Sequence, residues 1–159
     1  MADRQFRRHV ANIIRRAPWL ANSARIVWRI GQPKFTAGVV GVVFNTAGHL
    51  LLVEHVFHPY HPWGLPGGWV DRRESPADAV RRELQEELEL TVEVGPILLS
   101  QVDFGNHLDF AYLCHMQGSI GKLSNELLDH QWIAPSELPN VRRFHYHAIQ
   151  QALAIRSHS

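Results

Sequence analysis

Apolar residues follow one spacing near the N-terminus of this chain and another in the remainder, and the two spacings predict different elements. Over residues 4–30 apolar side chains recur every three or four positions with arginines between them, which predicts amphipathic helix broken near Pro18. Beyond residue 35 the apolar residues form short runs that end at turn residues, as is typical of buried strands. Strands are expected over residues 36–44, 49–57, 91–104, 107–117 and 128–133. The first two should form a buried hairpin, and a tight turn at Gly105-Asn106 should join the third and fourth.

Proline, glycine and serine mark the limits of the remaining elements. Residues 58–68 contain three prolines and three glycines, so we expect a loop with a constrained backbone, of the kind that often borders an active site. Ser75 and Pro76 predict the start of a helix, because serine is a favoured N-cap and proline is tolerated at the first helical position. This helix should run to about Leu88, and a last helix is expected over residues 142–156. The pattern favours mixed strands with few helices and no internal repeat.

Length and composition limit the class of protein. A chain of 159 residues with 45% hydrophobic content is long enough for one compact domain with a core and too short for two ordinary ones. The single cysteine, Cys114, excludes an internal disulfide framework and a cysteine-based zinc site, which favours a reducing compartment. No apolar run reaches the roughly 20 residues of a membrane-spanning helix, and the N-terminus lacks the apolar core of a secretory signal. A cytoplasmic protein is therefore expected.

Charge is unevenly distributed along the chain, although the formal net charge is only +1. Eight of the sixteen Lys and Arg residues lie within residues 1–34, against a single acidic residue, Asp3. We therefore expect a basic amphipathic N-terminal extension over residues 1–34, followed by a second domain over residues 35–159. The extension could pack on its own domain or on a partner subunit. An anionic membrane surface, nucleic acid and an organellar transit peptide are the alternatives.

Three carboxylates share one face of the helix predicted after Ser75. Glu83, Glu86 and Glu87 stand at positions i, i+3 and i+4, within an arc of about 100°. Like charges at this spacing destabilise an isolated helix, so the arrangement favours a nearby counter-cation. Carboxylate oxygens are ligands that Mg²⁺ and Mn²⁺ prefer, and such ions commonly bridge protein carboxylates to phosphates. A solvated face is the alternative, because most acidic helix faces bind nothing.

The sequence around these glutamates resembles the Nudix box. That motif reads Gly, five residues, Glu, seven residues, Arg-Glu, an aliphatic residue, any residue, Glu-Glu, any residue, Gly and an aliphatic residue. Here GWVDRRESPADAVRRELQEELEL, residues 68–90, matches every required position except one, and WGLPG, residues 63–67, is similar to the usual lead-in. The exception is Glu89, which stands where the family has glycine. A left-handed backbone kept there should cost roughly 1 kcal/mol, unless the helix runs on slightly.

The resemblance covers about residues 36–155 and implies both a fold and a metal site. The fold is an α/β/α sandwich with a mixed β-sheet, an α/β (α+β) architecture that suits the predicted strand order. The implied metal ligands are Glu83, Glu86 and Glu87, with the Gly68 carbonyl as a further one, and the implied ion is Mg²⁺ or Mn²⁺. Glu86 or Glu87 would also accept a proton from the attacking water.

Further roles are implied for residues outside the acidic face. Glu74 and Arg82 resemble the pair that braces the loop of the box against its helix. In many relatives an acidic residue from a separate loop completes the site or acts as general base, and Glu126 is the best-placed candidate. An ordinary exposed loop acid would look the same in sequence, and Asp103 and Asp109 are further candidates.

The function implied by the resemblance is divalent-metal-dependent hydrolysis of a diphosphate linkage by water attack at phosphorus. The substrate would be a small nucleoside diphosphate derivative or a nucleoside triphosphate, and the protein could form a homodimer. His55, Phe57, Tyr60 and Trp63 could line a nucleobase pocket, although core packing explains Phe57 and Trp63 equally well. RNA 5′-end pyrophosphohydrolysis, with the N-terminal arginines on the RNA backbone, is one alternative. A non-catalytic nucleotide-binding regulatory module is another, against which the intact glutamates argue.

Overall fold

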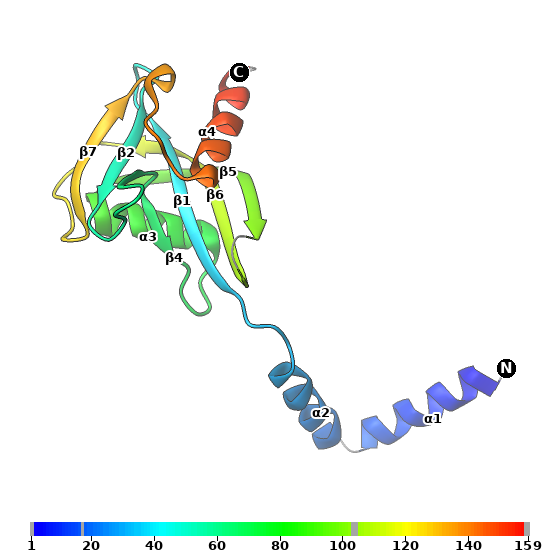
Figure 1. Ribbon diagram of the computed structural model, residues 1–159. Helices are drawn as coiled ribbons and strands as arrows, with labels where there is room; N and C mark the ends of the chain where they lie inside the picture. Colours follow the sequence, from blue (N-terminus) through cyan, green and yellow to red (C-terminus); the bar gives the residue numbers. More distant parts are fainter. Residues whose placement is uncertain (1, 17, 103–104, 158–159) are drawn as a thin grey trace. The chain divides into compact units, whose positions relative to one another are not determined.

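The computed structural model describes residues 2–16, 18–102 and 105–157, and the chain divides into two compact units, residues 1–34 and 35–159 (Figure 1). The first unit contains two helices, α1 (Ala2–Arg16) and α2 (Pro18–Ile30). Pro18 is the first residue of α2, where proline is tolerated because the first N–H groups of a helix have no intrahelical partner. None of the described helices is long and apolar enough to cross a membrane. That residues 1–34 act as a functional extension of residues 35–159 stays a prediction.

The second unit is built on a mixed seven-stranded sheet. Its central strand, β1 (Thr36–Phe44), runs parallel to β6 (His107–Gln117), and β6 pairs on its other side with antiparallel β5 (Thr91–Val102). The short strand β4 (Gly67–Trp69) lies antiparallel to the first half of β1. Strand β2 (Leu50–His55) pairs in antiparallel fashion with β3 (Trp63–Gly64) and with β7 (Leu127–Ile133). The predicted continuation of β5 to residue 104 lies outside the described residues.

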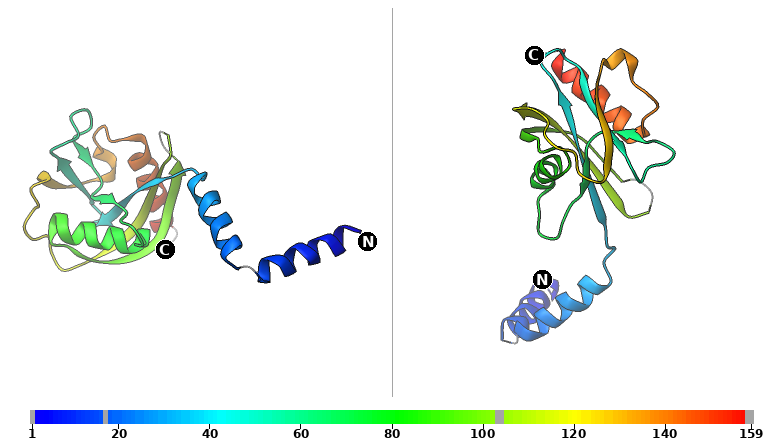
Figure 2. Two further views of the ribbon diagram at one scale, coloured as in Figure 1. Left: turned by 90° about the horizontal axis from the view of Figure 1, so that it is seen from below. Right: turned by 90° about the vertical axis from the view of Figure 1, so that its left-hand side faces the viewer.

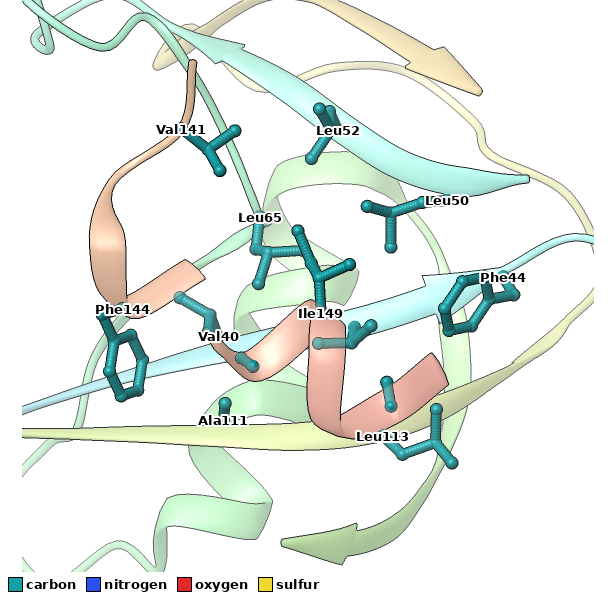
Figure 3. Packing of buried hydrophobic residues seen from close by; sticks show 13 residues of the cluster. Val40, Phe44, Leu50, Leu52, Leu65, Ala111, Leu113, Val141, Phe144 and Ile149 are labelled. Atoms are coloured by element: carbon teal, nitrogen blue, oxygen red, sulfur yellow. The ribbon is translucent and has the colours of Figure 1, made fainter. Parts of the chain in front are cut away.

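Two helices cover the two faces of this sheet, α3 (Pro76–Leu88) on one face and α4 (Arg143–Arg156) on the other (Figure 2). A short 3₁₀ helix, η1 (Pro135–Glu137), precedes α4. Side chains alternate between the faces along each strand, so Val40 of β1 packs with Phe144 and Ile149 of α4 (Figure 3), whereas Val39 packs with Leu84 of α3. Both faces of β1 are therefore buried, which explains its continuous apolar run. The predicted α/β/α sandwich with a mixed sheet is confirmed.

The hairpin predicted for the first two strands is wrong beyond its turn. β1 and β2 are paired only at Phe44 and Leu50. The edge of β1 that the hairpin would have used is occupied by β4 and by the carbonyl of Pro66, which accepts a hydrogen bond from the Gly41 N–H at 2.9 Å. This approach requires glycine at residue 67, where φ is 149° and a Cβ would overlap the Val39 carbonyl oxygen. The prediction of loop throughout residues 58–68 is also wrong, since β3, which pairs with β2, and the first two residues of β4, which pairs with β1, lie in that segment.

Helix α3 begins and ends where the sequence predicted. Ser75 is its N-cap, and the Ser75 hydroxyl accepts a hydrogen bond from the Asp78 N–H at 3.2 Å. The helix does not run on at its other end: Glu89 has φ 49° and ψ 30°, the left-handed conformation that glycine adopts at lower cost. The Glu89 carboxylate accepts a hydrogen bond from the Lys122 N–H at 3.1 Å, which offsets part of the cost of about 1 kcal/mol.

Candidate active site

Helix α3 presents the three predicted glutamates in three different environments. Its apolar stripe, which includes the fully buried Leu84 and Leu88, packs against the sheet and fixes the rotation of the helix. Glu87 is then buried, Glu83 is half-buried, and Glu86 has a side chain that is 60% exposed. The acidic face therefore runs from the interior of the unit to its surface.

Glu87 is the most perturbed carboxyl group of the site. Its Oε2 accepts a hydrogen bond from the Gly67 N–H at 3.0 Å. The pKa of Glu87 is raised to about 8, chiefly by burial and also by the neighbouring charges of Glu83, Glu126 and Glu86, whereas the Gly67 hydrogen bond lowers it. The pKa of Glu83 is raised as well, chiefly by burial, with Glu86 and Glu126 among the causes. Four carboxylates thus repel one another in one place.

Arg82 joins the loop of the box to the acidic face. Its guanidinium forms two hydrogen bonds with the Glu74 carboxylate, at 3.0 and 2.9 Å, and a third with the Trp69 carbonyl at 2.9 Å. The same group donates to Glu83 at 2.8 Å and to Glu86 at 3.1 Å. The hydrogen bonds from Arg82 hold the pKa of Glu74 below its usual value. Glu74 and Arg82, expected from the sequence to pair, are therefore in contact.

The two glycines of β4 lie directly against the acidic face. Gly67 supplies the N–H that binds Glu87. A Cβ on Gly68 would lie 2.5 Å from the carboxyl carbon of Glu83, so the backbone of residue 68 faces that carboxylate and no side chain fits between them. Strand β4 and helix α3 are held together by these contacts and by the Arg82 hydrogen bonds.

A cavity of about 270 Å³ opens beside this acidic face, and Glu126 belongs to it. Glu87 and Glu126 are among its acidic lining residues, and the negative charge of Glu126 helps to raise the pKa of both Glu83 and Glu87. The loop that carries Glu126 is tied to α3, because the Ser124 N–H donates to the Glu87 carbonyl at 2.9 Å. The structure thus brings the loop acid next to the helix acids, as the sequence led us to expect. Asp109 also lines the cavity, whereas Asp103 lies outside the described residues.

The remaining lining of the cavity is only partly the one suggested by the sequence. His55 and Phe57 line it, but Tyr60 is 90% exposed elsewhere and Trp63 packs with the core beneath α4. The sequence reasoning missed several lining residues, which are Trp69, His107, Arg142 and His145. A signal was available for two of them, because His107 and His145 occupy inward positions of β6 and α4 where apolar residues are the norm.

His145 is held as a neutral imidazole at the inner wall of this cavity. Its Nδ1 accepts a hydrogen bond from the Leu65 N–H at 3.1 Å. The pKa of His145 falls to about 3, chiefly because of burial and also because of the nearby charge of Arg142. Gly64 leaves the room for this ring, since a Cβ at residue 64 would lie 2.9 Å from it. Because Nδ1 is an acceptor, the ring proton must reside on Nε2.

The carboxylates of the site are suitable ligands for a hard divalent cation, although their oxygens do not converge on one position in this structure. Among residues 2–16, 18–102 and 105–157, no group of three or more acidic, histidine or cysteine side chains is close enough to hold an ion as it stands. The carboxylates of Glu83 and Glu86 are both hydrogen-bonded to Arg82. Carboxylate oxygens in mutual repulsion are nonetheless the donors that Mg²⁺ and Mn²⁺ prefer, and rotation of the exposed Glu86 side chain would complete the set.

Comparison with known proteins gives consistent matches. The NUDIX domain model matches residues 34–152. A MutT-like protein of Streptomyces ambofaciens is 28% identical over 67% of this chain and 68% of its own length. An RNA pyrophosphohydrolase of Psychrobacter cryohalolentis is 41% identical over a shorter stretch, 35% of this chain and 31% of its own length. The crystal structure of a MutT NUDIX hydrolase from Burkholderia pseudomallei superposes with a TM-score of 0.65 and 26% identity, covering 75% of this chain and 98% of that one.

Proposed function

This chain belongs to the Nudix hydrolase family, and on that premise we propose that it hydrolyses a diphosphate linkage in a nucleotide-type small molecule with the help of Mg²⁺ or Mn²⁺. The substrate would be a nucleoside diphosphate derivative or a nucleoside triphosphate. The observation that carries the proposal is the meeting of four carboxylates, those of Glu83, Glu86, Glu87 and Glu126, beside one cavity.

Residues of α3 and β4 would hold the cation. Glu83, Glu86 and Glu87 would supply carboxylate oxygens, and the Gly68 carbonyl lies on the segment that faces Glu83. When bound, the cation would neutralise charge on the diphosphate and lower the pKa of a water molecule. Arg82 and Glu74 would set the position of these ligands, since a planar guanidinium held by two parallel hydrogen bonds leaves little freedom of orientation.

An acidic side chain would accept the proton of the attacking water, and three glutamates are candidates. Glu87 is buried and its raised pKa makes it a better proton acceptor than an exposed carboxylate. Glu86 is the most exposed of the three helix acids. Glu126 comes from a separate loop and lines the cavity itself. Single substitutions to glutamine separate the three: loss of the base lowers kcat and removes the acidic limb of the pH profile, whereas loss of a ligand alone shifts the metal concentration needed.

The part of the substrate that is attached to the diphosphate would occupy the rest of the cavity, which is lined by His55, Phe57, Trp69 and His145. Aromatic rings and imidazoles suit a planar nucleobase, which supports a nucleotide as substrate. A panel of nucleoside triphosphates, nucleotide sugars, ADP-ribose and dinucleoside polyphosphates, offered with Mg²⁺ or Mn²⁺, tests the proposal. Release of phosphate or nucleotide from at least one of them is the expected result. No release from any would favour the non-catalytic, nucleotide-binding module instead.

RNA 5′-end hydrolysis is the second candidate, and two observations favour it. One is the local likeness to an RNA pyrophosphohydrolase, and the other is the basic character of residues 1–34. Triphosphate-ended RNA, added to the same panel, decides between them: an RNA substrate held by arginines must lose activity steeply as salt rises. The homodimer and the cytoplasmic location expected from the sequence also stay predictions. The free thiol of Cys114 is buried and suits a reducing compartment.

A further inference from the structure

The two units of the chain carry opposite charge. Residues 1–34 contain eight of the sixteen Lys and Arg residues and one of the fifteen acidic residues, a formal net charge of +7. Residues 35–159 hold the other eight basic and fourteen acidic residues, a net charge of −6. The proposed catalytic chemistry uses none of the basic residues of the first unit.

The first unit also exposes an unusual amount of apolar surface. Six of its large apolar side chains are at least 60% exposed, namely Phe6, Trp19, Ile26, Val27, Trp28 and Ile30. On α2, Trp19, Ile26 and Ile30 fall within an arc of about 40° at 100° per residue, so they form one stripe. Arg25 and Arg29 lie on the adjoining face. A contiguous apolar stripe bordered by cations is typical of a surface that meets a partner.

We propose that α1 and α2 bind the surface of an anionic lipid bilayer, with the apolar stripe of α2 inserted below the headgroups and the arginines against lipid phosphates. Helices with Trp and aliphatic residues on one face and arginine on the other lie in the interface plane of a membrane. Each helix is about 20 Å long, and none of the described helices can cross a bilayer, so the contact is with one leaflet. The net charge of −6 keeps residues 35–159 repelled from the same surface.

Charge and apolar exposure together favour this partner over two others. Contact between the helices of two copies of the chain would bring a +7 unit against another +7 unit, which opposes a dimer formed by helix-to-helix pairing. Nucleic acid would neutralise the arginines but leave Trp19, Ile26 and Ile30 in water, because phosphate contacts need no apolar partner. An anionic bilayer satisfies both the charge and the apolar stripe.

Vesicle co-sedimentation of the full-length protein tests the proposal without any need for hydrolysis. Vesicles of phosphatidylcholine alone are compared with vesicles containing about one third phosphatidylglycerol, at about 0.05 and 0.5 M salt. We expect binding to the anionic vesicles only, weakened by salt. The double variant Arg25→Gln/Arg29→Gln should lower the partition coefficient about fivefold for each arginine. The double variant Trp19→Ala/Ile26→Ala should lower it at least about tenfold.

A matched control separates this surface from general charge and apolar effects. The variant Leu128→Ala/Arg143→Gln removes one exposed apolar and one exposed basic side chain from the second unit and should bind as the wild type does. Circular dichroism and thermal unfolding establish that each variant is folded. The proposal is overturned by equal binding to neutral vesicles, by an equal loss in the control, or by wild-type affinity in both helix variants. A dimer that dissociates in the Trp19→Ala/Ile26→Ala variant, or RNA binding that needs the same side chains without vesicle binding, would also overturn it.

Discussion

Replacement of Glu87 by glutamine should stabilise the metal-free protein near neutral pH while it removes most of the activity. The substitution keeps the shape of the side chain and an oxygen that can accept the hydrogen bond from the Gly67 N–H. It removes a carboxyl group whose ionisation is opposed by burial and by neighbouring acids. The burial of Glu87 among other acids therefore reduces the stability of the metal-free fold near neutral pH.

The size of this effect follows from the pKa of Glu87, which is about 8 in the folded protein against 4.5 in an ordinary glutamate. A carboxyl group with a raised pKa holds its proton in the folded state after the unfolded state has released it, so stability is lost as pH rises from 4.5 to 8. At pH 7 the loss amounts to about 3 kcal/mol, and between pH 5 and pH 8 it grows by roughly 3 kcal/mol. The Glu87→Gln variant should regain this loss of unfolding free energy, minus a cost of about 1–2 kcal/mol for an amide buried with incomplete hydrogen bonding.

Urea unfolding in the presence of a chelator, at about pH 5 and about pH 8, measures the difference between wild type and Glu87→Gln. The variant should gain stability relative to wild type by roughly 3 kcal/mol between the two pH values. Glu93→Gln, at an exposed glutamate of β5, is the matched control and should show no such gain. A difference that is the same at both pH values, or a variant less stable than wild type at pH 8, would refute the reasoning.

Three further substitutions test the surroundings of the site. Glu89→Gly should leave turnover near that of wild type and change stability by less than about 1 kcal/mol, because relief of the left-handed strain is opposed by loss of the carboxylate hydrogen bond; a large gain in turnover would contradict this. Gly68→Ala should lower kcat about a hundredfold or more and reduce thermal stability only modestly, because the added methyl group displaces the Glu83 carboxylate. Wild-type kinetics in this variant would rule out the prediction. Arg82→Lys should lower the free energy of unfolding in urea by about 1–3 kcal/mol and raise the Mg²⁺ concentration needed for activity, since lysine cannot form the two hydrogen bonds to Glu74. An unchanged Mg²⁺ requirement would count against the proposed role of Arg82 in positioning the ligands.

Local signals in the sequence were sufficient for most elements of the fold. Ser75 and Pro76 predicted the start of α3, and the apolar runs predicted every strand of the structure except the short β3 and β4. The turn at Gly105-Asn106 correctly predicted the pairing of β5 with β6. The parallel pairing of β1 with β6 could not be predicted, because a run buried on both faces fits a hairpin and a parallel pair equally well. The divergence of β1 from β2 depends on Gly67, whose backbone approaches β1 too closely for any side chain. This close approach of Gly67 to β1 is a feature of the tertiary structure, and the only sign of it in the local sequence is a pair of glycines.

The candidate site was predictable where its residues share one helix and unpredictable where they come from several elements. Helical spacing alone placed Glu83, Glu86 and Glu87 together, and the resemblance to the family motif pointed to Arg82. Spacing could not reveal that Arg82 engages two of those glutamates, nor their different burial. The far wall of the cavity depends on the packing of α4 and β6 against β1, so His107 and His145 could be noticed in the sequence as histidines at inward positions but could not be assigned to the cavity.

The most direct test of the proposed chemistry is turnover in ¹⁸O-labelled water, with the full-length protein and the substrate that performs best in the panel. We predict that hydrolysis requires Mg²⁺ or Mn²⁺, stops on chelation and falls by orders of magnitude in Glu87→Gln. We also predict that ¹⁸O appears in a phosphate group of a product, because water attacks phosphorus. Turnover that persists in the chelator and in Glu87→Gln would contradict this prediction. So would ¹⁸O found in a sugar or alcohol hydroxyl group and in no phosphate group, because that label would place the attack at carbon.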